Sequence, residues 1–328
     1  MIKKLQSNFI RLVRILSDGC YHDGNSLGKT LNMTRSAVWK AIKKLEKYQI
    51  EIKSNKGKGY ALASPLQLLD PDVIKQHCQS PSIILDVFES IDSTNDYLKA
   101  INTIEKAIFC IAEEQTKGKG RLNRPWVSPF GKNIYFSCRY PFNKDVSALA
   151  GLSLVVGLAV VKTLQSYGIS DKLQVKWPND VYYDYKKLSG ILLEIQAESH
   201  DCMSHAIIGV GINVNLLDDK AITQSWTSMH KILGHTVDRN LLCARLINYL
   251  LPYLKWFDEQ GLAPFLAEWM ESDCLLHKEI TLKSVRNEIT GIVRGVNAVG
   301  HLLVELADGR VCAFSSGEVT IVKDNLSY

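Results

Sequence analysis

The chain has 328 residues, 46% of them hydrophobic and 22% charged, which is ordinary for a folded protein of two or three domains. It lacks an uncharged apolar run of about 18 residues and a signal-peptide core, so we expect no membrane span and a cytoplasmic location. Its eight cysteines are spread along the chain without a C-x-x-C pair, which argues against a disulfide framework and a zinc site.

Charge is distributed unevenly along the chain. Residues 1–63 contain 13 Lys or Arg and four Asp or Glu, a net charge of +9, whereas the whole chain carries +5. The remaining residues therefore carry −4. A basic head on a mildly acidic body is typical of a nucleic-acid-binding module joined to a second function.

The basic head predicts three helices followed by a β-hairpin. Apolar residues recur at helical spacing, from Ile2 and Leu5 onward, and Thr34 is a good N-cap for the third helix. The expected elements are helices at 2–16, 27–31 and 34–45, strands at 50–52 and 60–62, and a glycine-rich basic tip at 53–59. This order predicts a winged helix-turn-helix domain over residues 1–63.

The third helix and the wing tip carry the side chains that we expect to contact DNA. The N-terminal part of a recognition helix reaches base edges, while cations on its flank and on the wing neutralise phosphates. The expected contacts are Thr34, Arg35, Ser36, Trp39, Lys40, Lys43, Lys56 and Lys58. The alternatives are a solvated basic face and a winged helix that binds protein.

A central α/β domain is predicted over residues 64–272, after a short linker in which two prolines, one of them Pro65, bracket an apolar anchor. Runs typical of strands alternate with helical patterns, which indicates a mixed sheet. The expected strands are 83–88, 107–112, 133–137, 174–175, 188–195 and 206–214, and the expected helices are 93–101, 148–167 and 239–260.

Three segments of this domain suggest chemistry. Residues 114–126 place four cations and glycines in one loop, where backbone N–H groups can approach an anion, although the loop lacks the ending of a Walker motif. In 176–180, Pro178 fixes a turn at a strand end, and a lysine pair follows. Residues 209–215 form a strand with two glycines, which often marks close approach of a ligand. The alternatives are a disordered basic loop and a surface turn.

The tail, residues 273–328, predicts a small SH3-like β-barrel. Short strands are expected at 279–284, 288–296, 302–306, 311–314 and 319–322. Asp308 and Gly309 form a strong hairpin-turn signal. Nothing in this tail indicates catalysis, so a stabilising or docking module is the expectation.

Together, these motifs resemble those of the biotin–protein ligase family. Ser93-Thr94-Asn95, the 118–124 loop with Trp126, the 176–180 segment with Lys187, and the 209–213 strand occur in the family's order along nearly the whole chain. The basic winged helix in front makes the chain similar to the bifunctional class that also acts as a repressor.

The resemblance implies a biotin site, a nucleotide site and one metal ligand. For biotin it implies Ser93, Thr94, Asn95, Gln115, Lys119, Gly120, Arg121, Trp126, Lys187, Gly190, Leu192 and Gly209. For ATP it implies Lys119, Arg121, Asn179, Lys187, Asn213 and Trp226, with Trp226 on the adenine. Lys187, Arg121 and Asp180 are implied as catalytic, and Asp180 would also help to place Mg²⁺.

Two positions depart from the family loop, which usually reads Gly-Arg-Gly-Arg-Arg-Gly-Arg. Lys119 replaces an arginine, which retains the charge but not bidentate recognition of an anion. Asn123 replaces a glycine, and asparagine tolerates a positive φ better than most residues. The bend of the loop is therefore expected to survive.

The resemblance implies an ATP-dependent ligase that forms biotinyl-5′-AMP and transfers biotin to a lysine of the biotin carboxyl carrier protein of acetyl-CoA carboxylase. It also implies a repressor of biotin synthesis genes that binds operator DNA as a homodimer, with biotinyl-AMP as corepressor. A lipoate–protein ligase would share the catalytic architecture without explaining the basic head. A ligand-sensing repressor without catalysis would release no pyrophosphate from ATP.

Overall fold

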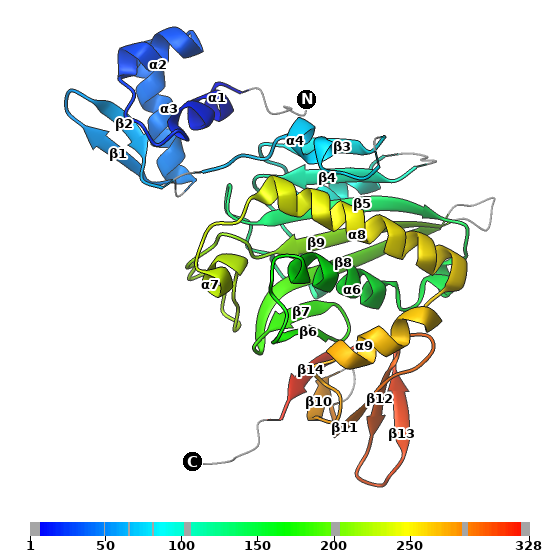
Figure 1. Ribbon diagram of the computed structural model, residues 1–328. Coiled ribbons are helices and arrows are strands. Elements are labelled where there is room, and N and C mark those ends of the chain that lie inside the picture. The colour runs from blue at the N-terminus through cyan, green and yellow to red at the C-terminus, as the bar shows by residue number, and fades with distance from the viewer. Residues whose placement is uncertain are drawn as a thin grey trace, which may run out of the picture.

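The computed structural model describes residues 7–48, 50–64, 66–80, 82–101, 106–197, 204–283 and 288–322. Ile2, Leu5, Pro65 and Ser284, which belong to predicted elements, lie outside these residues. Figure 1 shows a winged helix at one end, a large sheet with helices in the middle and a small antiparallel sheet at the other end. This is the predicted fold class.

Three helices and a hairpin form the N-terminal part, as predicted. They are α1 (Asn8–Leu16), α2 (Gly24–Leu31), α3 (Arg35–Lys47), β1 (Ile52–Asn55) and β2 (Gly59–Leu62). The Thr34 side chain caps α3 by accepting a hydrogen bond from the N–H of Ala37 at 3.2 Å. Because residues 53–55 continue β1, which pairs Asn55 with Gly59, the wing tip is shorter than the predicted span of 53–59.

The central part is a seven-stranded mixed sheet in the order β3-β4-β5-β9-β8-β7-β6, in which only the β3–β4 pair is parallel among the described strands. The strands are β3 (Ile84–Phe88), β4 (Ile108–Ala112), β5 (Ile134–Phe142), β6 (Leu173–Lys176), β7 (Asp180–Tyr183), β8 (Lys186–Ala197) and β9 (Ser204–Ile212). The helices are α4 (Pro71–Gln76), α5 (Thr94–Lys99), α6 (Leu152–Gln165), α7 (Met229–Leu233), α8 (Arg239–Gln260) and α9 (Leu266–Ser272). The sequence did not reveal β7, α4, α7 or α9.

The two faces of this sheet have different neighbours. Helices α6 and α8 cover one face, where Ile208 and Val210 of β9 enter the main hydrophobic core (Figure 1). Side chains alternate along a strand, so Gly209 and Gly211 face the opposite side, where α5 lies. Because glycine has no side chain, other groups can lie close to the backbone of the sheet at these two positions.

Helix α6 is the central helix of the core. It begins later than the predicted residue 148, at Leu152, because Gly151 adopts a φ of 81° after a 3₁₀ turn. The stretch Val146–Gln165 is long and apolar enough to cross a membrane by length and composition. However, 61% of its most apolar window is buried within the protein, which fits a core helix packed on the sheet beside α8.

The winged helix packs on the body. Phe130, a residue of the body, is 1% exposed and contacts Phe9 of α1 and Tyr48 after α3, with ring centroids 5.5 and 5.1 Å away. Leu66 and Leu68 of the linker are buried in the same cluster. The predicted linker is therefore part of a hydrophobic core.

The N-terminus of α8 holds this linker in place. Arg239 forms an ion pair with Glu113 at 2.7 Å, and the two side chains are 1% and 0% exposed. Arg239 also donates to the carbonyl of Gln67 at 2.6 Å, and Asn240 donates to the carbonyl of Leu68 at 3.0 Å. Removing one partner of a buried ion pair is strongly destabilising, so loss of either Arg239 or Glu113 should loosen the attachment of the linker.

The C-terminal part is a five-stranded antiparallel sheet in the order β13-β12-β11-β10-β14. Its strands are β10 (Glu279–Lys283), β11 (Glu288–Val296), β12 (Leu302–Glu305), β13 (Val311–Phe314) and β14 (Glu318–Ile321). Among the described residues β13 and β14 each pair with one neighbour only, so the sheet is not closed into a barrel, although its strands are those predicted. The indole N–H of Trp177 donates to the carbonyl of Gly300 at 3.0 Å, which joins this sheet to the body.

Candidate active site and DNA-binding surface

A cavity of about 600 Å³ lies on the α5 side of the sheet. It brings together every residue that the family resemblance assigns to biotin, to ATP or to catalysis. These are Ser93, Thr94, Asn95, Gln115, Lys119, Gly120, Arg121, Trp126, Asn179, Asp180, Lys187, Gly190, Leu192, Gly209, Asn213 and Trp226. The segments that carry them are far apart in the sequence, so the fold alone assembles this cavity.

Polar side chains gather at one end of the cavity, at the start of α5. Ser93 caps this helix by accepting from the N–H of Asp96. The N–H of Thr94 donates to Gln115 Oε1 at 2.9 Å. The hydroxyl of Ser137, a residue of β5 that the sequence did not single out, lies 2.7 Å from Thr94 Oγ1. This end can therefore exchange several hydrogen bonds with a polar ring.

Trp126 forms an apolar wall of the cavity. A Cβ atom at Gly211 would lie 2.4 Å from the Trp126 ring, and one at Gly190 would lie 3.0 Å from it. Both positions therefore need glycine so that the indole can lie on the sheet. The sequence suggested that a ligand approaches the glycines of β9. In the structure the groups nearest to them are side chains of the protein itself, Trp126 at Gly211 and Asn95 at Gly209.

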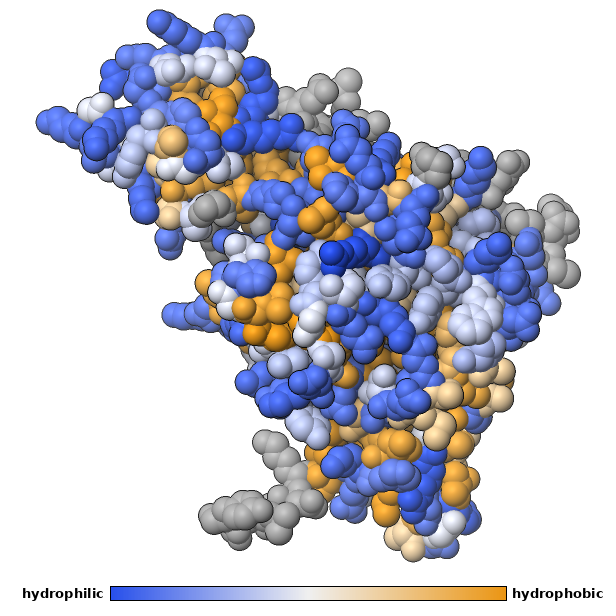
Figure 2. Space-filling model, in the orientation of Figure 1, coloured by the Kyte–Doolittle hydropathy of each residue, from blue (hydrophilic) through white to orange (hydrophobic). Residues whose placement is uncertain are grey.

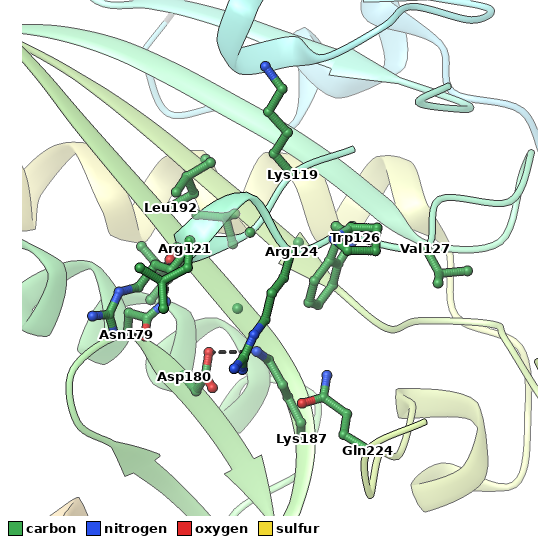
Figure 3. A pocket seen from close by; sticks show the side chains of 18 of the residues that line it. Lys119, Arg121, Arg124, Trp126, Val127, Asn179, Asp180, Lys187, Leu192 and Gln224 are labelled. Atoms are coloured by element: carbon green, nitrogen blue, oxygen red, sulfur yellow. Dashed lines mark hydrogen bonds and ion pairs between the residues drawn. The ribbon is translucent and has the colours of Figure 1, made fainter. Parts of the chain in front are cut away.

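Cationic side chains occupy the other end of the cavity. Lys187 Nζ lies 2.8 Å from Asp180 Oδ1, and the two side chains are 15% and 19% exposed. Arg121 donates to Asn179 Oδ1 at 3.2 Å (Figure 3), and burial lowers the pKa of Arg121. Burial also lowers the pKa of Lys176, whose ammonium lies 5.0 Å from the Tyr182 ring centroid. Such partly desolvated cations suit an anionic ligand.

The hairpin of β6 and β7 places Asn179 and Asp180. The predicted turn at Pro178 is correct, but Asp180 opens a strand and pairs with Gly190 of β8. Asn179 Nδ2 donates to the carbonyl of Ile191 at 2.6 Å. These contacts fix both side chains at the rim beside Lys187.

The side chain of Lys119 points away from the cationic end of the cavity, unlike those of Lys187 and Arg121. Its ammonium lies 2.6 Å from Asp96 Oδ2 in α5, and its side chain is 41% exposed. Figure 3 shows Lys119 pointing away from Lys187 and Asp180. It lines the cavity but, in this structure, its charge is directed outward.

The C-terminal sheet also lines the cavity, through Gly317, Glu318, Val319 and Thr320. Glu318 forms an ion pair with Arg124 of the glycine-rich loop. No sequence pattern signalled this contribution, because a contact across nearly 200 residues leaves no local trace. Among the described residues, no three His, Cys, Asp or Glu side chains cluster as a metal site.

All eight side chains expected to contact DNA are exposed, and the winged-helix part presents a mainly hydrophilic surface in Figure 2. Trp39 in the middle of α3 is 52% exposed, which is unusual for tryptophan. Lys43 forms an ion pair with Glu46 at 2.8 Å. In contrast, the ammonium of Lys44 lies 4.6 Å from the ring centroid of Phe9 in α1 and 4.0 Å from Glu89 Oε1 of the body. The lysines expected to contact DNA therefore lie on the exposed face of α3 and the wing, whereas Lys44 makes contacts within the protein.

Comparisons with known proteins match both parts of the chain. The biotin/lipoate A/B protein ligase family matches residues 87–213, and the HTH domain matches residues 10–61. The chain is 38% identical over 315 residues to the bifunctional ligase/repressor BirA of Salmonella typhimurium. This alignment covers 95% of the present chain and 97% of that protein. It is 37% identical to the bifunctional ligase/repressor BirA of Escherichia coli, with 95% and 96% coverage.

A solved structure is also similar over most of the chain. The biotin protein ligase from Aquifex aeolicus in complex with biotin and ATP has a TM-score of 0.63 and 31% identity, and it covers 74% of this chain and 99% of that chain. The chain belongs to the family of bifunctional ligase/repressors within the biotin/lipoate protein ligases.

Proposed function

We propose that the chain is an ATP-dependent biotin–protein ligase and a DNA-binding repressor. The observation that carries the ligase function is one cavity with a polar end at Thr94 and Gln115, an apolar wall at Trp126, and a cationic end at Lys187 and Arg121. Biotin has the matching order of groups, because its ureido ring is joined by an apolar chain to a carboxylate.

In the first step, a carboxylate oxygen of biotin attacks the α-phosphorus of ATP, pyrophosphate leaves, and biotinyl-5′-AMP forms. Lys187 would pair with the carboxylate and then with the acyl phosphate, while Arg121 and Asn179 would hold the phosphates. Asn213 and Trp226 would contact the nucleotide. Mg²⁺ would arrive with ATP and neutralise its phosphates, with Asp180 as the ligand from the protein.

In the second step, the amine of a carrier lysine attacks the acyl carbon, AMP leaves with the bonding electrons, and the amine loses a proton to solvent. The product is an amide of biotin. The Trp126 wall would shield the mixed anhydride from water until the carrier arrives. We propose the biotin carboxyl carrier protein of acetyl-CoA carboxylase as the carrier.

We propose three units for these functions: a DNA-binding domain at 1–63, a catalytic domain at 64–272 and a C-terminal domain at 273–328. The basic winged helix would bind operator DNA as part of a homodimer that forms when biotinyl-AMP is bound. The protein would act in the cytoplasm, where the carrier, ATP and DNA are all present.

Release of pyrophosphate from ATP tests the ligase function. We expect release that depends on biotin, followed by transfer of labelled biotin to a purified carrier domain. Release that depends on lipoate instead would favour a lipoate ligase. No release with either acid, from protein that still binds biotin, would favour a repressor without catalysis.

A further inference from the structure

The glycine-rich loop is folded into a short arm, residues 118–126, beside the cavity. The N–H of Trp126 donates to the carbonyl of Gly118 at 2.9 Å, and the N–H of Gly120 donates to the carbonyl of Arg124 at 2.7 Å. These hydrogen bonds pair the two halves of the arm with each other. The arm therefore holds its shape through its own backbone, and it can move as one piece.

Two ion pairs attach the arm to different parts of the protein. Lys119 Nζ lies 2.6 Å from Asp96 Oδ2, in the first turn of α5. Arg124, on the other half of the arm, forms an ion pair with Glu318 of β14. Figure 3 shows the side chains of Lys119 and Arg124 leaving the arm in opposite directions. The arm is therefore held on one side by the central sheet's helix α5 and on the other by the C-terminal sheet.

The attached arm forms part of the cavity wall. Most of its residues line the cavity, and between the two attachments Arg121 turns inward and donates to Asn179 at 3.2 Å. The ammonium of Lys119, in contrast, is paired outside the cavity, so it serves to hold the arm. Because Arg121 and Trp126 both belong to the arm, its movement would open the cavity on their side.

We propose that Asp96 and Glu318 are positioning residues that hold the arm against the cavity and thereby retain biotinyl-5′-AMP between the two half-reactions. The inference rests on the proposed ligase function and deepens it, because a mixed anhydride that escapes is lost to water or to any free amine. The four side chains of the two ion pairs are between 38% and 67% exposed. Each pair is therefore weak, and the arm still opens to admit biotin and ATP.

Conservative substitutions remove the attachments one at a time. Asp96→Asn and Glu318→Gln each break one ion pair, and the double variant D96N/E318Q breaks both. Glu305→Gln is the matched control for Glu318, because it breaks a partly exposed ion pair elsewhere in the same sheet. Asp184→Asn is the control for Asp96, because it breaks an ion pair of similar exposure elsewhere in the central domain.

Exchanging the charges of Asp96 and Lys119 distinguishes an attachment from a ligand contact. D96K and K119D each place like charges opposite one another, whereas D96K/K119D restores an ion pair of reversed polarity. If Lys119 acts through Asp96, the exchanged pair retains the adenylate better than either single variant. If the Lys119 ammonium contacts the phosphate of the ligand instead, the exchange places an anion there, and retention stays as poor as in K119D.

The test is the rate at which each full-length variant releases preformed, radiolabelled biotinyl-AMP into a chase of unlabelled biotinyl-AMP. We expect release to rise about two- to fivefold in D96N and in E318Q, and about 10-fold in the double variant, as for exposed ion pairs at independent sites. E305Q and D184N should stay within about twofold of the parent. Added salt should speed release from the parent more than from the double variant, which has no ion pair left to screen.

Escape of the adenylate has a second readout. The double variant should biotinylate serum albumin, a protein that is not a carrier, faster than the parent does, because free biotinyl-AMP reacts with exposed amines.

Release from the double variant at the rate of the parent would overturn the inference, as would an equal acceleration by E305Q. Failure of D96K/K119D to improve on both single variants would assign Lys119 to the ligand and remove Asp96 from its role. If the parent chain forms no adenylate from biotin and ATP, the proposed ligase function itself falls. That outcome differs from a parent that forms the adenylate and variants that all retain it.

Discussion

Lys187 and Asp180 neutralise each other at the rim of the cavity, with Nζ and Oδ1 2.8 Å apart and both side chains mostly buried. Asp180 opens β7, and Lys187 lies beside it on β8. Without a ligand, the carboxylate of Asp180 takes the place that we propose for the anionic groups of biotin and ATP. Binding of these groups therefore exchanges one anionic partner of Lys187 for another, and the ammonium is never left unpaired.

Lys187→Ala should cripple adenylate formation without unfolding the protein. It removes a charge-assisted contact to the developing acyl phosphate, which should cost about 3 kcal/mol, or about 100-fold in rate. Lys186→Ala is a matched control, because the neighbouring Lys186 is exposed. Biotin-dependent pyrophosphate release measures both variants, and near-normal release by Lys187→Ala would remove this lysine from the site.

Deletion of residues 1–63 should abolish specific DNA binding and leave a folded protein. The deletion uncovers Phe130, Leu66 and Leu68, so the truncated chain should aggregate more readily than the full chain. Adding Phe130→Ser to the truncated chain should restore its solubility. Gel-shift and light-scattering measurements check both effects, and a truncated chain that still binds the operator fragment would refute the domain assignment.

Biotinyl-adenylate should promote dimerisation and operator binding more than biotin does. Leu122 and Leu217, on two loops beside the cavity, are 70% and 55% exposed, and ordering these loops would allow a partner subunit to cover such residues. A ligand shifts a monomer–dimer equilibrium only through better contacts with one state. Sedimentation equilibrium with and without ATP plus biotin tests this. Equal dimerisation and unchanged operator affinity would exclude the coupling.

Asp273, at the junction with the C-terminal sheet, should make stability depend on pH. Burial raises the pKa of Asp273 to about 6, whereas in the unfolded chain it has its ordinary value near 4. The native state thus binds the proton more tightly, and the free energy of unfolding should fall as pH rises from about 4 to about 6, by at most about 3 kcal/mol.

Asp273→Asn should flatten this dependence and raise the melting temperature at pH 7, because asparagine can still accept from the N–H of Leu275. Thermal melts over this pH range provide the measurement. Asp171→Asn, at an exposed position, is the control. A pH profile unaltered by Asp273→Asn would show that the buried carboxyl is not responsible.

Local signals predicted much of the fold. The cap at Thr34 and the long helix Arg239–Gln260 were correct because their apolar periodicity and capping residues are local. Strand β7 was missed because the turn at Pro178 looked like a loop and its four residues are too short for a pattern.

The family resemblance, rather than hydrophobic periodicity, identified the residues that line the cavity. It could not predict which of these side chains contact one another. The outward pairing of Lys119 with Asp96 and the contact of Ser137 with Thr94 depend on side chains from distant segments. The open edge of the C-terminal sheet likewise depends on pairings that no single strand encodes.

The anchored linker has a consequence for the DNA target. The buried pair of Arg239 and Glu113 and the Phe130 cluster fix the recognition helix relative to the catalytic body. In a homodimer, the distance between the two recognition helices would then be set by the protein before DNA arrives. Such a dimer would hold its two recognition helices at a fixed spacing. If one base pair were inserted between the half-sites, the DNA would have to twist or bend to restore that spacing.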